Sequence, residues 1–264
     1  MPLPDLQAAR DLVVDIARQE LPHRCDISAR HKADGSLVTE ADLVVQRRIR
    51  AALEEQWPQP GFLGEEMERA EQEQALQSLD QGVWCLDPLD GTNNFASGIP
   101  YYAVSLAFLR KDGAQLAIVY DPSREECFTA LRGQGAWLNG QPLPPPSATR
   151  ALHDTLALVD FKRLPAELIT RLARTPPYAS QRSFGAIALD WCWLAAGRVQ
   201  LYLHGGQKLW DYAAGQLILE EAGGRCVGLD GQPVYQAGLR TRSAVAALDG
   251  ELFEAWCAWL DVNL

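Results

Sequence analysis

The segment Asp87–Phe95 constrains the fold more than any other part of this sequence, because it follows an apolar run with two carboxylates and a turn. The four residues before it, Val83 to Leu86, are apolar and predict a buried strand that delivers Asp87 to its carboxyl end. Pro88 cannot donate to a sheet ladder, so we expect the strand to end there and the backbone to turn. Both Asp87 and Asp90 would then lie at the end of a strand, free to bind a cation.

The turn after these acids has the chemistry of a phosphate-binding loop. Gly91 permits backbone torsions that other residues resist, and Thr92 can cap a short helix whose first N–H groups point outward. The same residue types also form ordinary solvated turns, so the segment alone leaves that reading open. Its spacing excludes an EF-hand loop, which needs oxygen ligands at positions 1, 3 and 5 and Gly at 6. It also differs from the haloacid-dehalogenase pattern, in which the acids stand two apart.

Two other segments offer acids that could join this pair. Glu65 follows the short apolar run Phe62–Gly64, and Asp211 follows Trp210 at the start of an apolar-periodic helix that stops at a Gly-Gly pair. Each has a purely structural alternative, since Glu65 could begin a charged helix and Asp211 could be an N-cap. The chemistry of a metal site therefore depends on whether the fold brings the segments together.

In combination, these segments resemble the inositol monophosphatase family of magnesium-dependent, lithium-sensitive phosphatases. The matching motifs, in the family's order and spacing, are Gly64-Glu65-Glu66, Asp87 to Phe95, and Trp210-Asp211 with Glu221 to Gly224. Weaker agreement extends the resemblance over nearly the whole chain, at Lys32 to Asp42, Ala103 to Leu106, Tyr120 to Pro122, Arg182 to Gly185 and Ala195 to Gly197. The resemblance implies a layered αβαβα sandwich, with α+β and α/β parts and the site between two halves.

The family resemblance assigns a role to each matching residue. Glu65 and Asp87 with the Leu89 carbonyl would hold one Mg2+, and Asp87, Asp90 and Asp211 a second, so two or three ions are expected. Carboxylates this close repel one another unless cations lie between them, and Mg2+ prefers oxygen ligands and retains several waters. The catalytic residues implied are Glu65, Thr92 and Asp42, of which Thr92 and Asp42 would orient and deprotonate a metal-bound water, without a covalent enzyme intermediate.

The residues implied at the catalytic end have alternatives of their own. Asp42 also fits a capping box with Thr39 as N-cap, at the start of the helix that follows. Lys32 either approaches the metal site or decorates a polar loop. The N–H groups of Gly91 and Thr92 are expected to take the phosphate.

The substrate side departs from the family pattern. Seven residues before Asp211, animal members carry a Glu that bonds inositol hydroxyls, whereas this chain has His204, with Lys208 nearby. His204 could bond a hydroxyl, contact an anion when protonated, or simply face solvent at a strand end. The residues implied to contact substrate are Leu89, Asp90, Gly91, Thr92, Gly185, Ala186, Ile187, His204 and Asp211.

Several activities therefore stay open. The first is hydrolysis of a small monoester such as myo-inositol monophosphate. Other family members cleave adenosine bisphosphate, fructose bisphosphate, histidinol phosphate or nicotinamide dinucleotide phosphates. A non-enzymatic alternative is an anion-binding regulatory protein that retains the fold.

Length and periodicity predict two lobes. A chain of 264 residues with 47% apolar content can build one large core or two smaller ones. The proline cluster at Pro142–Ser147 predicts a junction between an N-terminal α+β lobe, 1–146, and a C-terminal α/β lobe, 147–264, although an ordinary loop across one core is the alternative. We expect helices at 6–21, 41–56, 186–196 and 212–222, and strands at 83–86, 103–109, 116–120, 127–131, 155–161 and 199–203.

Charge and composition limit the partners. A formal net charge of −10 argues against nucleic-acid and anionic-membrane partners. Six cysteines form no close pair, and the histidines show no zinc spacing. The sequence shows neither a signal-peptide pattern nor an apolar run long enough to span a membrane, which predicts a cytoplasmic protein. The family resemblance implies a homodimer that acts on a small phosphorylated metabolite.

Overall fold

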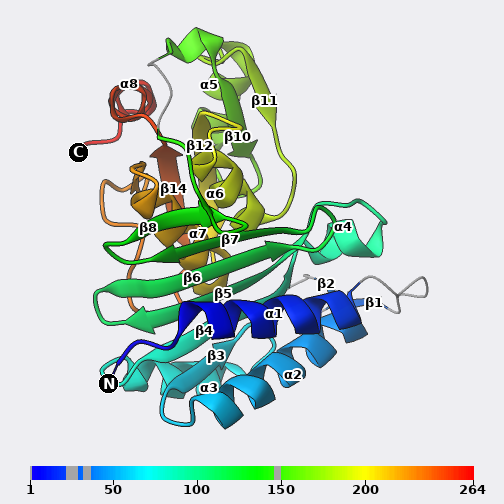
Figure 1. Ribbon diagram of the computed structural model, residues 1–264. Helices are drawn as coiled ribbons and strands as arrows, with labels where there is room; N and C mark the ends of the chain where they lie inside the picture. Colours follow the sequence, from blue (N-terminus) through cyan, green and yellow to red (C-terminus); the bar gives the residue numbers. More distant parts are fainter. Residues whose placement is uncertain (1, 22–28, 32–36, 146–149) are drawn as a thin grey trace.

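The computed structural model describes residues 2–21, 29–31, 37–145 and 150–264. Its helices and strands stack in five layers, two outer layers and one middle layer of helices with a β-sheet between each pair (Figure 1). This is the αβαβα sandwich that the family resemblance implies. The predicted role of Lys32 and the predicted lobe junction at 146/147 lie outside the described residues.

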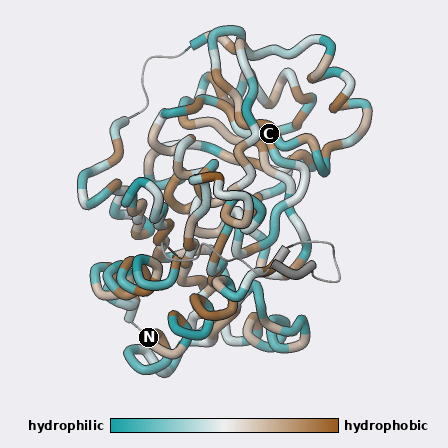
Figure 2. Tube along the Cα trace, turned by 90° about the vertical axis from the view of Figure 1, so that its right-hand side faces the viewer, coloured by the Kyte–Doolittle hydropathy of each residue, from teal (hydrophilic) through white to brown (hydrophobic). Residues whose placement is uncertain are grey.

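The first outer layer consists of α1 (Leu6–Glu20) and α2 (Glu40–Gln56), which lie side by side on one face of the larger sheet (Figure 1). Their apolar residues recur at helical spacing and are buried, as Val13, Val45 and Ile49 illustrate. Both predicted helices are confirmed. The helices at the edge of the molecule alternate between hydrophilic and hydrophobic residues along the trace, as expected for elements with one face in water (Figure 2).

The larger sheet has seven strands in the order β3-β4-β5-β6-β7-β8-β9. β3 and β4 are parallel, and each later neighbour is antiparallel. The strands are β3 (Gly61–Gly64), β4 (Val83–Asp90), β5 (Ala103–Arg110), β6 (Gly113–Asp121), β7 (Glu126–Leu131), β8 (Gly135–Leu138) and β9 (Gln141–Pro142). Every residue of β4 is buried, because helices cover both faces of the sheet at this point.

β4 does not end at Pro88, so that prediction was wrong. The strand continues to Asp90 through an irregularity in its pairing with β5, where Asp87 faces Ser105 and Asp90 faces Ala103. Three steps along β4 thus match two along β5, which is the count of a β-bulge. A bulge tolerates a residue that has no N–H to donate, and the sharp turn comes only at Gly91.

The middle layer consists of α6 (Ile187–Ala195) and α7 (Leu209–Glu221), which are buried between the two sheets. The smaller sheet has the order β11-β10-β12-β14-β13, and α5 (Ala166–Arg174) and α8 (Gly250–Leu260) cover its outer face (Figure 1). Its strands are β10 (Leu156–Asp160), β11 (Ser180–Arg182), β12 (Leu201–Gln207), β13 (Arg225–Val227) and β14 (Arg242–Ala247). The remaining elements are β1 (Ala29–His31), β2 (Leu37–Thr39), α3 (Arg69–Ala75), α4 (Thr92–Ala96), η1 (Leu76–Ser78) and η2 (Leu152–Asp154).

The two halves of the chain share one buried cluster. Val83 and Ala107 of the larger sheet belong to the same apolar cluster as Trp191 of α6, Leu217 of α7 and Ala246 of β14. The helices of the second half thus complete the core of the first. Within the described part of the chain, no helix is both long and apolar enough to cross a membrane.

Candidate metal and phosphate site

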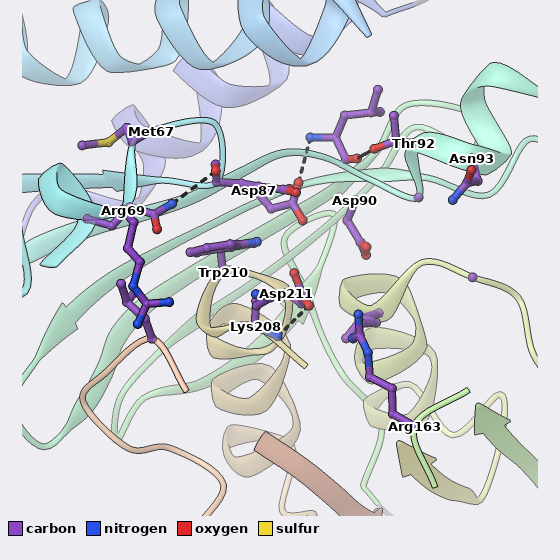
Figure 3. Close-up of a pocket in the computed structure, with 17 residues that line it drawn as sticks. Met67, Arg69, Asp87, Asp90, Thr92, Asn93, Arg163, Lys208, Trp210 and Asp211 are labelled. Atoms are coloured by element: carbon purple, nitrogen blue, oxygen red, sulfur yellow. Dashed lines mark hydrogen bonds between the residues drawn. The ribbon is translucent and has the colours of Figure 1, made fainter. Parts of the chain in front are cut away.

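A cavity of about 680 Å3 opens where β4 ends and the helices α4, α6 and α7 begin. Acidic side chains from three separate segments reach it, and Asp87, Asp90 and Asp211 point toward its centre (Figure 3). The described residues that line it are Glu65, Met67, Arg69, Gln72, Asp87, Leu89, Asp90, Gly91, Thr92, Asn93, Arg163, Gly185, Ile187, Lys208, Trp210, Asp211 and Leu239. The fold therefore brings together all three acidic motifs that are separate in the sequence.

Backbone N–H groups restrain each of the three buried carboxylates that line the cavity. The Leu89 N–H donates to Oδ1 of Asp87 at 3.0 Å, and the Ala188 N–H at the start of α6 donates to Oδ2 of Asp90 at 2.6 Å. The Lys208 N–H donates to Oδ2 of Asp211 at 2.7 Å. Asp211 is the third residue of α7, and the N-cap is Lys208, so the N-cap alternative for Asp211 was wrong. Backbone donors thus fix the orientation of all three carboxylates.

Burial and mutual repulsion make these carboxylates hard to ionise together. Burial is the main cause that raises the pKa of Asp87 well above its usual range, and the charges of Glu65, Asp90 and Asp211 add to it. The pKa of Asp90 is raised well above its usual range by burial and then by Asp211. The pKa of Asp211 is raised to about 7, first by burial and then by Glu65, against smaller opposing effects that include the charges of Arg163 and Lys208. Buried carboxylates in such a group are stable in the charged form only beside cations.

Glu65 lies outside any helix, so the helix-start alternative for it was wrong. Its N–H donates to the Leu86 carbonyl at 3.1 Å, which extends the pairing of β3 with β4, and α3 begins only at Arg69. Gln72 of α3 donates from Nε2 to the Glu65 carbonyl at 3.2 Å. The backbone of Glu65 is thus fixed at the rim of the cavity.

Asp42 forms the capping box considered for it and also contacts Thr92. Its Oδ2 accepts the Thr39 N–H at 2.7 Å and the Thr39 hydroxyl at 2.5 Å, which is the capping-box arrangement at the start of α2. Its Oδ1 lies 3.2 Å from Oγ1 of Thr92, which is also 3.0 Å from the Leu89 carbonyl oxygen. Burial is the main cause that raises the pKa of Asp42, and the bonds from Thr39 oppose it. Asp42 is therefore held behind Thr92 rather than in the wall of the cavity.

Gly91 makes the turn at which α4 begins, and Gly91, Thr92 and Asn93 all line the cavity. Its φ is +89°, a left-handed conformation that favours glycine. A Cβ at this position would lie 2.9 Å from the Tyr101 carbonyl oxygen and 3.1 Å from Cβ of Ala186. Because the first N–H groups of a helix have no intrahelical partner, they are available to an anion.

Replacing Gly91 by Ala should therefore cost more stability than the positive φ alone explains. We expect Gly91→Ala to lower the free energy of unfolding by about 2–4 kcal/mol, from left-handed strain plus displacement of Tyr101 or Ala186. Urea unfolding measures the change. Gly98→Ala is the matched control, because Gly98 also has a positive φ of +72° but nothing lies within 4 Å of its added Cβ. Equal losses in both variants would contradict the role of the close contacts.

The substrate-side residues expected from the sequence divide into two groups. Gly185 and Ile187 line the cavity, whereas Ala186 is fully buried beneath Gly91.

Asn94 ties this segment to α4, because its Nδ2 lies 2.7 Å from the Phe184 carbonyl oxygen and 2.8 Å from that of Tyr101. Asn94 belongs to the Asp87–Phe95 motif, but the sequence analysis predicted no role for it.

His204 does not line the cavity and does not face solvent. It lies within β12, which continues to Gln207, and only 4% of its surface is exposed. Its Nδ1 accepts the Gly206 N–H at 3.1 Å. Burial lowers the pKa of His204 to about 4, against the opposing charge of Asp160, so the ring is neutral near pH 7. The solvent-facing alternative was wrong, and Arg163 and Lys208 form the wall of the cavity on this side.

The donors present fit Mg2+. Among the described residues, no three His, Cys, Asp or Glu side chains form a group that could together hold one metal ion. Mg2+ requires only one or two carboxylates when carbonyl and water oxygens complete its octahedron. Asp87, Asp90 and Asp211 supply hard oxygen atoms, the Leu89 carbonyl adds another, and none of the three acids forms an ion pair within the described ranges. Such a set favours Mg2+ over metals that prefer sulfur or nitrogen.

Comparison with known proteins agrees with the layered fold and the three motifs. Residues 4–261 match the model of the inositol monophosphatase family. The chain is 34% identical over 248 residues to the Nus factor SuhB of Haemophilus influenzae. The aligned region covers 92% of this chain and 89% of that protein. It is 36% identical over 200 residues to inositol monophosphatase 1 of Solanum lycopersicum, covering 74% and 72%. The structure of an inositol monophosphatase from Anabaena aligns with a TM-score of 0.76 at 28% identity, covering 98% of each chain.

Proposed function

The chain belongs to the inositol monophosphatase family, and from this membership we propose that it is a Mg2+-dependent phosphomonoesterase. The observation that carries the proposal is the convergence of three buried carboxylates with the Gly91–Thr92 turn on one cavity. A phosphate monoester is already dianionic, so its hydrolysis needs positive charge and N–H donors at the phosphate oxygens. The carboxylates can bind the metal ions that bring the positive charge. The N–H groups of the Gly91–Thr92 turn can serve as the donors.

We assign two or three Mg2+ ions to the carboxylates. Glu65, Asp87 and the Leu89 carbonyl would hold one ion. The family pattern assigns Asp87, Asp90 and Asp211 to another, which in this conformation would bind through one or two of these carboxylates with water completing its octahedron. When bound, Mg2+ supplies positive charge to the phosphate oxygens and makes a water ligand more acidic. The raised pKa values of Asp87 and Asp90 support this assignment, because these buried groups need a compensating charge to ionise.

The residues beside the carboxylates would handle the phosphate and the proton. The N–H groups of Gly91 and Thr92 bind phosphate oxygens, while the Thr92 hydroxyl orients the attacking water. The Thr92 hydroxyl accepts a proton from that water and passes its own proton to Oδ1 of Asp42, the oxygen that faces it. The water oxygen forms a bond to phosphorus, and the bond from phosphorus to the alcohol oxygen breaks. The leaving oxygen takes up a proton from solvent water, and Asp42 returns its proton to solvent. One water is consumed, and a free alcohol and inorganic phosphate are released.

A monoester of a small polyol, such as myo-inositol monophosphate, is the first substrate to try. The relative named inositol monophosphatase 1 supports this choice. The experiment is a panel of phosphate monoesters incubated with the protein and Mg2+, with colorimetric detection of inorganic phosphate. We expect release from at least one polyol or sugar phosphate. No release from any ester would overturn the proposal.

The relative called Nus factor SuhB supports a second candidate, a non-enzymatic role in which the chain retains the fold and binds partners. The same panel separates the two candidates. Saturable, Mg2+-dependent turnover supports the enzyme, whereas absence of turnover by a folded protein that still binds Mg2+ in a calorimetric titration supports the binding role.

A further inference from the structure

Two cationic side chains face the cavity from the wall opposite β4. Arg163, in the loop between β10 and α5, points into the space beside α7, and Lys208 lies at the N-terminus of that helix (Figure 3). Neither forms an ion pair with an acid in the described ranges, whereas Arg48, Arg124 and Arg198 all do. Cations that face a cavity without an acidic partner are suited to an anion from outside the protein.

The fold holds the loop that carries Arg163 close against β12. Nη1 of Arg163 donates to the Gly206 carbonyl at 2.5 Å. A Cβ on Gly205 would lie 2.1 Å from the Arg163 carbonyl oxygen, and a Cβ on Gly206 would lie 3.0 Å from Cδ of Arg163. The Gly-Gly pair of β12 is therefore what allows this loop its close approach. One anchored nitrogen fixes the direction of the guanidinium and leaves its other N–H groups available.

His204 contacts both Gly206 and Asp160, which hold the loop that carries Arg163. Its Nδ1 accepts the Gly206 N–H, so the neutral ring carries its proton on Nε2, which lies 3.7 Å from Oδ2 of Asp160. Oδ1 of Asp160 accepts the Lys162 N–H at 2.7 Å, one residue before Arg163. His204 is thus a positioning residue for the loop rather than a contact for substrate.

We propose that Arg163 and Lys208 bind a second anionic group, a phosphate or a carboxylate, on the alcohol portion of the substrate. The proposal rests on the proposed phosphatase function and specifies its substrate class. A cavity of about 680 Å3 has room for more than one phosphate group. A neutral polyol would leave both cations facing the cavity without an anion, whereas a planar guanidinium matches the oxygens of a phosphate or carboxylate.

A second explanation for these cations is that they only offset the charge of the carboxylates. In that case removal of Arg163 would weaken Mg2+ binding and lower turnover of every substrate by the same factor. If Arg163 instead contacts the substrate, the loss of kcat/KM in the variant depends on whether the substrate has a second anionic group. The two explanations therefore differ in the ratio of kcat/KM between matched substrates.

The test compares wild type with Arg163→Gln on two substrate pairs at saturating Mg2+. Fructose 1,6-bisphosphate against fructose 1-phosphate probes a second phosphate, and 3-phosphoglycerate against glycerol 3-phosphate probes a carboxylate. We expect wild type to prefer the doubly anionic member of at least one pair by about tenfold or more, the effect of a charge-assisted hydrogen bond. Arg163→Gln should abolish that preference, so that its loss of kcat/KM on the doubly anionic member exceeds its loss on the singly anionic member by about tenfold.

Lys162→Gln is the matched control, because it removes the same charge from the adjacent residue, which is exposed and does not line the cavity. It should retain the preference. Two results would overturn the second-anion site and leave the phosphatase proposal intact. One is an equal loss of kcat/KM on both members of each pair in Arg163→Gln, and the other is a wild-type ratio of kcat/KM near one for both pairs. Absence of phosphate release from all four esters and from the wider panel would overturn both.

Discussion

Replacing Asp90 by Asn should lower kcat/KM for phosphate release about 100- to 1000-fold, the size of effect seen when one preorganised electrostatic group is lost. The change removes a negative charge from a proposed ion-binding oxygen, but the Asn carbonyl can still accept the Ala188 N–H that Oδ2 of Asp90 accepts at 2.6 Å. The local geometry should therefore persist while the affinity for Mg2+ falls.

The same substitution should make the metal-free protein more stable. Because burial and the charge of Asp211 raise the pKa of Asp90, its charged form is disfavoured in the folded state. The folded protein then binds more protons than the unfolded chain above the usual carboxyl pKa, so this group costs stability as the pH rises. Asn removes that cost, and we expect a gain of about 1 kcal/mol or more in EDTA at pH 7.

Phosphate release and urea unfolding in EDTA measure the two effects of Asp90→Asn together. Asp112→Asn is the control, because that carboxylate is exposed and only accepts a hydrogen bond from Gln115. It should change neither quantity by much. Full turnover in Asp90→Asn, or a loss of metal-free stability, would count against a metal-binding role for this carboxylate.

Replacing Thr92 by Val should lower kcat by about 100- to 10,000-fold, the range for loss of a group that takes part in proton transfer. Val retains the shape and the β-branch of Thr, so the start of α4 should be preserved. What it loses is Oγ1, which lies between Oδ1 of Asp42 and the Leu89 carbonyl. Without the hydroxyl, Asp42 loses its contact with the site of the attacking water.

Thr92→Ser is the control for this second substitution, because it returns the hydroxyl without the methyl group. Steady-state kinetics at saturating Mg2+ should show kcat of the Ser variant within about tenfold of wild type, and KM similar in all three proteins. If Val and Ser variants lost the same amount of kcat, the hydroxyl would have no catalytic role and the shape of the turn would matter instead.

The fold was largely predictable because each layer carries its own periodic signal. The helices at α1 and α2 alternate apolar and polar residues at helical spacing, and the sheet strands are nearly continuous apolar runs. The end of β4 was not predictable, since Pro88 stops a regular strand but fits a bulge. Whether a bulge forms depends on the register with β5, which lies beyond the local sequence.

The two walls of the site also differ in how well the sequence predicts them. On the carboxylate side, Glu65, Asp87, Asp90 and Asp211 stand in short motifs beside strand and helix ends, so the sequence identified all four. On the other side, Arg163 comes from a loop without any pattern, and glycines more than forty residues later determine where it lies. His204 drew attention because it replaces an expected residue, yet its burial depends on the loop above it.

The most direct measurement of the central claim is phosphate release by wild-type protein that has been stripped of metal with EDTA and then titrated with Mg2+. Using the most active ester of the panel, we expect no turnover above background in EDTA and a saturable return as Mg2+ is added. The Asp90→Asn variant should stay about 100- to 1000-fold below wild type across the same titration range. Turnover that is equal in EDTA and in Mg2+ would contradict a catalytic metal site built on these carboxylates.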